Sequence, residues 1–94
     1  MSLNRLSDKL VFNILAGISV GFLEITNYQG EVFKFGNPQD NLKAKLKIKK
    51  PNFSLNLIKG GSIGFAESYM RGEFETDNLS NLIEITARNI TIIY

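Results

Sequence analysis

Cysteine and histidine are both absent from this 94-residue sequence, and their absence narrows the chemistry that the chain can support. Without cysteine there is neither a disulfide framework nor a thiolate metal site. Without histidine the chain lacks the commonest general base and the commonest metal ligand. These two gaps exclude Ser-His-Asp hydrolysis, Cys-His proteolysis and most zinc chemistry within this chain.

Long apolar runs and an even spread of acidic residues are also missing. No stretch approaches the roughly 18–20 apolar residues of a membrane-spanning helix. The N-terminus lacks the basic and then apolar segments of a secretory signal, so we expect a cytoplasmic protein. No acid lies between Asp40 and Glu67, where six lysines fall, so the middle of the chain is basic although the net charge is only +2.

The apolar pattern predicts an α+β fold in a single domain over residues 1–94. We expect a small, mostly antiparallel sheet, with an N-terminal helix and C-terminal helices packed on one face. Leu6, Leu10 and Ile14 recur at helical spacing and predict an amphipathic helix that begins near Leu3 and ends near Ala16. Extended segments at 19–26 and 31–35, joined by a turn that contains a glycine, predict a hairpin.

After the third strand, helix breakers divide the chain into short elements. Pro51 favours the start of one short helix, which Gly60-Gly61 can end, and a second helix is expected from Ser62 to Arg71. A brief strand is expected at 73–75. Thr76 or Asp77 is the expected cap of a last helix.

The third strand has the clearest pattern in the sequence, because apolar residues alternate strictly with lysines. The four lysines of this row are Lys43, Lys45, Lys47 and Lys49. A period of two places all four on one face of a sheet. One interpretation is a membrane-surface site for anionic lipid headgroups, and the other is a solvated face whose lysines protect a sheet edge. Nucleic acid is the weaker partner, because the face lacks aromatic residues for base stacking.

The acidic residues in the C-terminal third do not form a recognisable metal site. Glu67, Glu73, Glu75 and Asp77 match no calcium-loop spacing, and we interpret them as ordinary surface acids. The glycine-rich segment 60–64 follows a helix rather than a strand and lacks the Walker lysine, so it predicts a helix-to-helix turn. No metal ligand is assigned.

Residues 60–74 read Gly-Gly-Ser-Ile-Gly-Phe-Ala-Glu-Ser-Tyr-Met-Arg-Gly-Glu-Phe, and the pattern continues through Thr76-Asp77-Asn78-Leu79, Leu82 and Asn89. This segment resembles the N-terminal domain of the cyclopropane-fatty-acyl-phospholipid synthase family. The likeness extends from about Gly21 to Asn89, and the Glu-Ser-Tyr-Met block is its most specific part. Phe74 departs from the family pattern, where many members carry tryptophan.

The resemblance implies an accessory N-terminal domain with a sterol-carrier-like fold, truncated before a methyltransferase domain. That missing C-terminal domain would bind S-adenosylmethionine and carry the catalytic residues, so neither cofactor-binding nor catalytic residues are assigned to this chain. The implied partners are membrane phospholipid, at the inner face of the membrane, and the chain's own catalytic domain. The residues expected at an interdomain or lipid contact are Gly64, Phe65, Glu67, Ser68, Tyr69, Met70 and Gly72.

Two other functions stay open on the sequence alone. The chain is alternatively a stand-alone lipid carrier with an internal apolar pocket, or a dimerisation module that forms a homodimer. Residues 90–94 read Ile-Thr-Ile-Ile-Tyr, which is a poor solvent-exposed tail. We therefore expect the natural chain to continue beyond Tyr94, or these residues to dock onto the domain.

Overall fold

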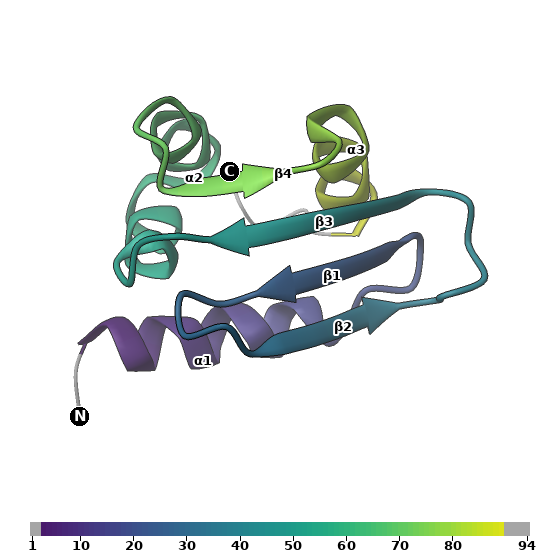
Figure 1. Ribbon diagram of the computed structural model, residues 1–94, viewed down its shortest axis with the longest axis horizontal. Helices are drawn as coiled ribbons and strands as arrows, with labels where there is room; N and C mark the ends of the chain where they lie inside the picture. The colour runs from purple at the N-terminus through teal and green to yellow at the C-terminus, as the bar shows by residue number, and fades with distance from the viewer. Residues whose placement is uncertain (1–2, 90–94) are drawn as a thin grey trace.

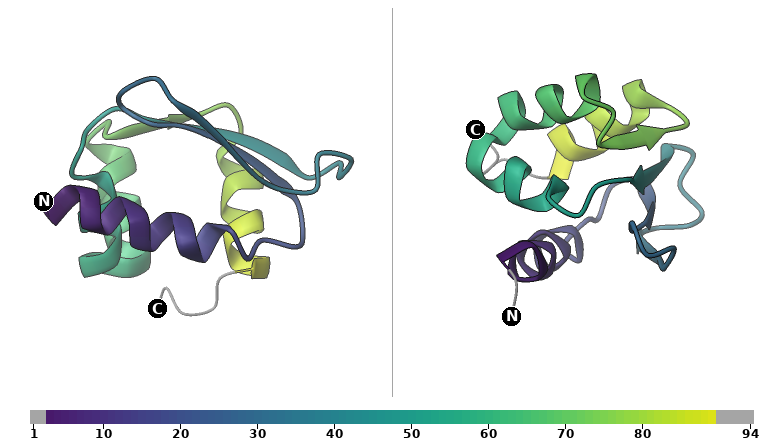
Figure 2. Two further views of the ribbon diagram at one scale, coloured as in Figure 1. Left: turned by 90° about the horizontal axis from the view of Figure 1, so that it is seen from below. Right: turned by 60° about the vertical axis from the view of Figure 1, so that its left-hand side comes forward.

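A computed structural model describes residues 3–89 of the chain, and Figure 1 shows their arrangement. Four strands form one sheet in the order β2-β1-β3-β4. Their bounds are β1 Phe22–Thr26, β2 Val32–Gly36, β3 Lys43–Ile48 and β4 Phe74–Thr76. The helices are α1 Leu3–Leu15, α2 Phe53–Met70 and α3 Leu79–Asn89. Figure 2 shows all three helices on the same face of the sheet. The predicted α+β class and one-sided helix packing are confirmed.

The sheet is mixed. β1 pairs antiparallel with β2, and β3 pairs antiparallel with β4, but β1 and β3 run parallel. A mostly antiparallel sheet was expected, and two of the three pairings are antiparallel. The parallel pair places β1 and β3 at the centre of the sheet, where they supply Leu23, Ile25, Ala44, Leu46 and Ile48 to the core.

The predicted hairpin is present, but its first strand begins later than expected. The Asn27 side chain accepts hydrogen bonds from the Gln29 and Glu31 N–H groups and shapes the turn. Ser19 and Val20 lie outside β1 because both of their N–H groups donate to Asn89 Oδ1, at 3.0 Å each. The Asn89 amide nitrogen in turn donates to Val20 O at 2.7 Å. A side chain from α3 thus satisfies backbone groups that a strand neighbour would otherwise pair.

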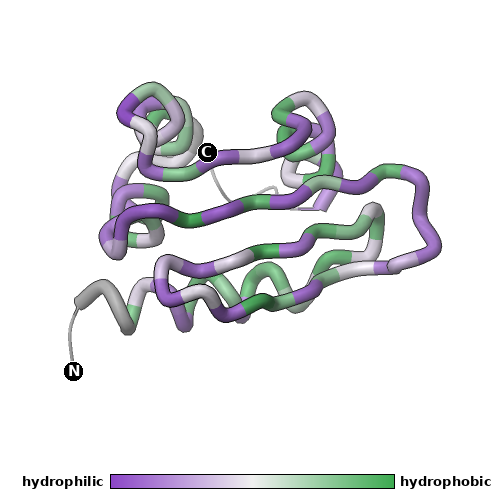
Figure 3. Tube along the Cα trace, in the orientation of Figure 1, coloured by the Kyte–Doolittle hydropathy of each residue, from purple (hydrophilic) through white to green (hydrophobic). Residues whose placement is uncertain are grey.

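Along β3 the predicted alternation is confirmed. Ala44, Leu46 and Ile48 are buried, and Lys43, Lys45 and Lys47 are exposed. Figure 3 shows this strand alternating between hydrophilic and hydrophobic residues. One strand therefore supplies both the core and a charged outer face.

α2 is interrupted at Gly61, where φ is 55° and ψ is −133°. A residue with a Cβ adopts this conformation only at a cost, so the interruption requires glycine. The two halves of α2 approach closely. A Cβ added at Gly64 would collide with the backbone carbonyl of Asn56. The two short helices expected on either side of Gly60-Gly61 are thus present as the two halves of α2.

α3 is capped by Asn78, since Asn81 N–H donates to Asn78 Oδ1 at 3.0 Å. The expectation that Thr76 or Asp77 caps this helix was wrong, because both side chains bind β3 instead. Thr76 Oγ1 donates to Lys45 O at 2.6 Å, and Lys45 N–H donates to Asp77 Oδ1 at 2.7 Å. These two bonds extend the edge of β3 beyond the short β4.

α1 buries a different stripe from the one expected. Ser7, Val11 and Leu15 are buried, while Leu6 and Leu10 are about half exposed. Within residues 3–89, no helix combines the length and apolar character needed to cross a bilayer. The expectation for residues 90–94 lies outside the described residues.

Candidate functional site

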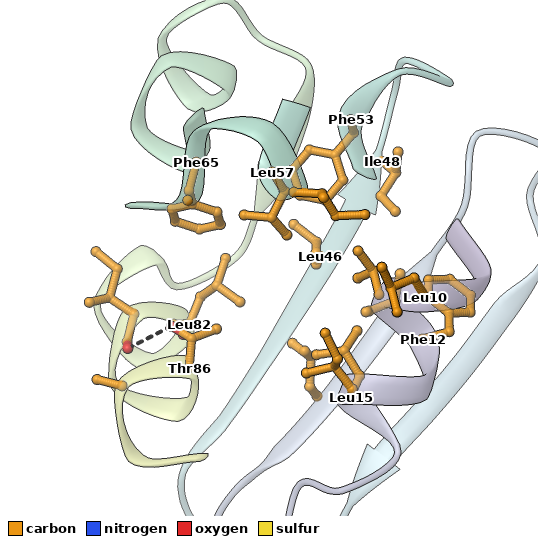
Figure 4. A pocket seen from close by; sticks show the side chains of 18 residues that line it. Leu10, Phe12, Leu15, Leu46, Ile48, Phe53, Leu57, Phe65, Leu82 and Thr86 are labelled. Carbon is orange, nitrogen blue, oxygen red and sulfur yellow. Dashed lines mark hydrogen bonds between the residues drawn. The ribbon is translucent and has the colours of Figure 1, made fainter. Parts of the chain in front are cut away.

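A cavity of about 450 Å³ lies between the sheet and the three helices. Its floor is formed by the inward side chains of β1 and β3, and its walls by α1, α2 and α3. The residues that line it are Leu10, Val11, Phe12, Ile14, Leu15, Leu23, Ile25, Leu46, Ile48, Phe53, Leu57, Ile58, Gly61, Phe65, Leu82, Ile83, Thr86 and Ala87. Figure 4 shows the labelled side chains from these elements surrounding a common space. The volume falls within the range of small-molecule binding sites, roughly 300–1,000 Å³.

The lining is almost entirely hydrocarbon. Thr86 supplies the one polar side chain among the described lining residues. Its hydroxyl lies 2.8 Å from Ile83 O and 3.1 Å from Leu82 O, so its proton is already committed to the backbone of α3. No charged side chain reaches the cavity from the described part of the chain. The site therefore has no group for acid–base or nucleophilic chemistry and is suited to binding an apolar ligand.

The cavity opens between the helices, on the side away from the sheet. Leu10 of α1, Ile58 of α2 and Ile83 of α3 line it and are also 49%, 42% and 50% exposed. We call these three residues the mouth. A large aliphatic side chain that is half exposed leaves apolar surface in water, and three of them meet here around one opening.

The predicted contact segment on α2 is divided between the cavity and the packing of the domain. Phe65 lines the cavity, and its ring centroid lies 4.9 Å from that of Phe74. Gly64 permits the close approach of the two halves of α2. Ser68 is fully buried, and Gly72 adopts a positive φ of 70° at the turn into β4. Gly64, Ser68 and Gly72 thus have structural roles within the domain.

The other members of the contact segment face solvent. Glu67 and Met70 are exposed, and Met70 retains 77% of its accessible surface. Tyr69 is 44% exposed, although its ring centroid lies 5.6 Å from that of Phe74. Of the seven predicted contact residues, the structure brings only Phe65 into the cavity. Glu67, Tyr69 and Met70 are left accessible to another domain.

Glu73 is not an ordinary surface acid, and that interpretation was wrong. Its side chain is buried, and its carboxylate accepts hydrogen bonds from Arg71 Nε at 2.9 Å and Asn56 Nδ2 at 3.0 Å. The Arg71 hydrogen bond, with help from Ser68 and Asn56, lowers the pKa of Glu73 against the opposing effect of burial. This carboxylate joins the first half of α2 to the end of the second. Glu67, Glu75 and Asp77 are exposed, as expected.

The four-lysine row lies on the outer face of the sheet, opposite the cavity. The row is partly neutralised, because Glu24 of β1 stands in register with Lys34 of β2 and Lys45 of β3. Lys49 Nζ lies 2.8 Å from Glu75 Oε1, and this pair lowers the pKa of Glu75. β3 has a neighbour on both sides, so the interpretation that its lysines protect a sheet edge was wrong.

An internal apolar pocket was expected only under the lipid-carrier alternative, and the sequence did not predict which residues line it. The pattern of α1 indicated an amphipathic helix, but not that Leu10, Phe12 and Leu15 border an open space. Within residues 3–89, no cluster of three or more acidic side chains is arranged to hold a metal ion. Comparison with protein-family models, with curated proteins and with solved structures found no match to this chain.

Proposed function

We propose that this chain is a lipid-binding accessory domain of a phospholipid-modifying methyltransferase of the cyclopropane-fatty-acyl-phospholipid synthase type. The main observation that supports this proposal is the apolar cavity. A space of about 450 Å³, whose described lining side chains are apolar apart from Thr86 and offer no spare hydrogen-bond donor, matches the acyl chain that such an enzyme modifies. The sequence resemblance over residues 60–74 supplies the enzyme class, and the cavity supplies a role for the domain.

In this function the domain holds lipid, and the catalytic domain performs the chemistry. S-adenosylmethionine does not fit the cavity, because its carboxylate, ammonium and sulfonium groups would be buried without partners. The cofactor therefore belongs to the proposed catalytic domain. Glu67, Tyr69 and Met70, which are exposed beside the cavity wall, are the candidates for contact with that domain.

The four-lysine row supports a peripheral position at the cytoplasmic face of the membrane. Each lysine near an anionic bilayer contributes about 1 kcal/mol to binding. Glu24 and Glu75 on the same face reduce this attraction, so we expect binding to be weak and sensitive to salt. The lysines bring the domain to the bilayer, but they lie on the face opposite the mouth, so a domain docked by this row does not present its cavity to the membrane.

Lipid extraction from the purified chain tests this function. The protein is expressed in bacteria and isolated without detergent, and organic extracts are examined by mass spectrometry. We expect phospholipid or fatty acid at close to one molecule per chain. A chain that neither retains lipid nor takes it up from phospholipid vesicles would contradict the proposal.

A stand-alone lipid carrier is the second candidate, and the same cavity favours it. The two functions differ in what happens to the lipid. A carrier moves labelled phospholipid from donor to acceptor vesicles by itself, whereas an accessory domain raises the turnover of a catalytic domain supplied with it. Vesicle transfer with the isolated chain separates them.

A further inference from the structure

We infer that the cavity binds one lipid hydrocarbon chain, tail first, and leaves the polar headgroup outside the mouth. The site would then select for the chain and be indifferent to the headgroup. This inference rests on the proposed lipid-binding function and names the part of the lipid that the site recognises.

The size of the cavity argues for an occupant. An engineered cavity of about 150 Å³ lined by aliphatic residues stays dry and binds benzene. The cavity here has about three times that volume, at about 450 Å³. Because this cavity opens at the mouth, its apolar lining stands against water unless a ligand covers it, and covering apolar surface is favourable. A flexible hydrocarbon chain can supply that cover.

The lining decides which part of a lipid enters. A phosphate, carboxylate or glycerol ester placed against Leu23, Ile25 or Leu46 would lose its hydrogen bonds to water and gain none. Thr86 does not change this result, because its proton is already donated within α3. The interior therefore excludes a headgroup.

The position of the mouth sets the direction of entry. Leu10, Ile58 and Ile83 surround the opening from three different helices, and the floor opposite them is the sheet. A chain that enters between the helices ends against the inward side chains of β1 and β3. Its polar end stays at the level of the mouth, where water reaches it.

Three ligands with the same 18-carbon monounsaturated chain test the inference: oleic acid, oleyl alcohol and methyl oleate. Each displaces 8-anilinonaphthalene-1-sulfonate from delipidated protein. We expect dissociation constants within about threefold of one another. Saturated acids of increasing length should bind about fourfold more tightly per added CH₂, until the cavity is full and the affinity levels off.

Three substitutions sharpen the test. Leu57→Trp places a larger side chain in the cavity, and we expect it to weaken all three ligands at least tenfold. Tyr28→Trp, at the hairpin turn outside the cavity, is the matched control and should bind as the original chain does. Thr86→Val removes the one polar side chain that the described residues contribute to the lining, with little change of shape, and should alter no affinity by more than twofold.

The possible results distinguish a failure of the tail-first inference from a failure of the proposed lipid-binding function. A preference of more than tenfold for one headgroup, or a loss on Thr86→Val confined to the acid and alcohol, overturns the tail-first inference and leaves lipid binding intact. Equal affinities for the three ligands, with no change in affinity along the series of saturated acids, also overturn the tail-first inference. If none of the three ligands binds, the proposed function fails as well. The ligand series on the original chain decides these points even if Leu57→Trp does not fold.

Discussion

The outer face of β3 meets solvent, whereas its inner face meets the helices. The role of the outer face follows from the strand alone, and the role of the inner face depends on other elements of the fold. The outer face carries lysines in a pattern that is complete within six residues. The inner face forms a binding surface only together with α1, α2 and α3, which are widely separated in the sequence and enclose the cavity. A charged face can therefore be recognised from a short segment, whereas a binding cavity is a property of the whole fold.

The largest expected effect comes from disrupting the cavity wall at Gly64. Gly64→Ala forces a Cβ against the Asn56 carbonyl, and the two halves of α2 must separate. We expect a loss of about 3 kcal/mol or more in the free energy of unfolding, measured by urea denaturation, because a backbone atom cannot move aside easily. Lipid binding should fall with it.

Gly60 offers a matched control four residues earlier. A Cβ at Gly60 meets nothing within 4 Å. Gly60→Ala should therefore leave stability unchanged or raise it by up to about 1 kcal/mol, through the better helix propensity of alanine. Equal losses for the two substitutions would mean that close approach at Gly64 does not hold the wall together.

A smaller effect is expected from Glu73, the buried carboxylate that joins the ends of α2. Glu73→Gln should cost about 1.5–3 kcal/mol at pH 7, the usual contribution of a hydrogen bond to a charged group. The native pKa of Glu73 is lowered from its ordinary value of 4.5, so its contribution is present above that value. The contribution is lost as the pH falls through the native pKa.

Urea denaturation of both chains between pH 7 and pH 3 measures this dependence. The difference in unfolding free energy should be constant at neutral pH and shrink below about pH 4.5. A difference that grows on acidification would contradict a lowered pKa.

Substitutions in the four-lysine row should change vesicle binding without changing the stability of the fold. Lys45→Gln with Lys47→Gln should weaken flotation with vesicles that contain anionic phospholipid, by about 1 kcal/mol per lysine. Unfolding free energy should change by less than about 0.5 kcal/mol, because both side chains lie on the exposed face. Affinity for oleic acid should be unchanged. A parallel loss of vesicle and fatty-acid binding would show that the two faces do not act separately.

The smallest effect concerns Ser54, a fully buried residue whose hydroxyl has no hydrogen-bond partner among the described residues. Ser54→Ala removes an unsatisfied polar group from the α2 side of the core. We expect stability to rise by about 1 kcal/mol in thermal denaturation. A loss of similar size would show that the hydroxyl is bonded.

Local features of the fold were predictable, and features that depend on distant partners were not. The alternation along β3 and the break at Gly61 follow from short-range periodicity and from glycine. The parallel pairing of β1 and β3 does not, because a period of two fixes the faces of a strand but not its neighbour. The late start of β1 depends on Asn89, some 70 residues away.

The residues of the candidate site also differ in whether the sequence alone could predict their roles. Phe65 was predicted as a contact residue and does line the cavity. The burial of Glu73 depends in part on Asn56, 17 residues earlier, which no spacing rule connects to it. The helical spacing of α1 placed Leu6 and Leu10 on its core side, yet the buried stripe lies one residue further along, at Ser7, Val11 and Leu15. One residue is a rotation of about 100° around the helix, and this rotation decides which side chains of α1 line the cavity mouth.

The four hydrogen bonds of the Asn89 side chain also set an order of events during synthesis. Asn89 holds Ser19 N–H, Val20 N–H and Val20 O, and it caps Ile85 O within its own helix. These hydrogen bonds can therefore fix the segment that leads into β1 only after the chain as far as Asn89 has left the ribosome. Until Asn89 emerges, the Ser19 and Val20 N–H groups lack this partner, so the segment that enters the central strand pair is not yet secured. Asn89 is therefore the last residue of the described fold to emerge, and its side chain secures a segment made about 70 residues earlier.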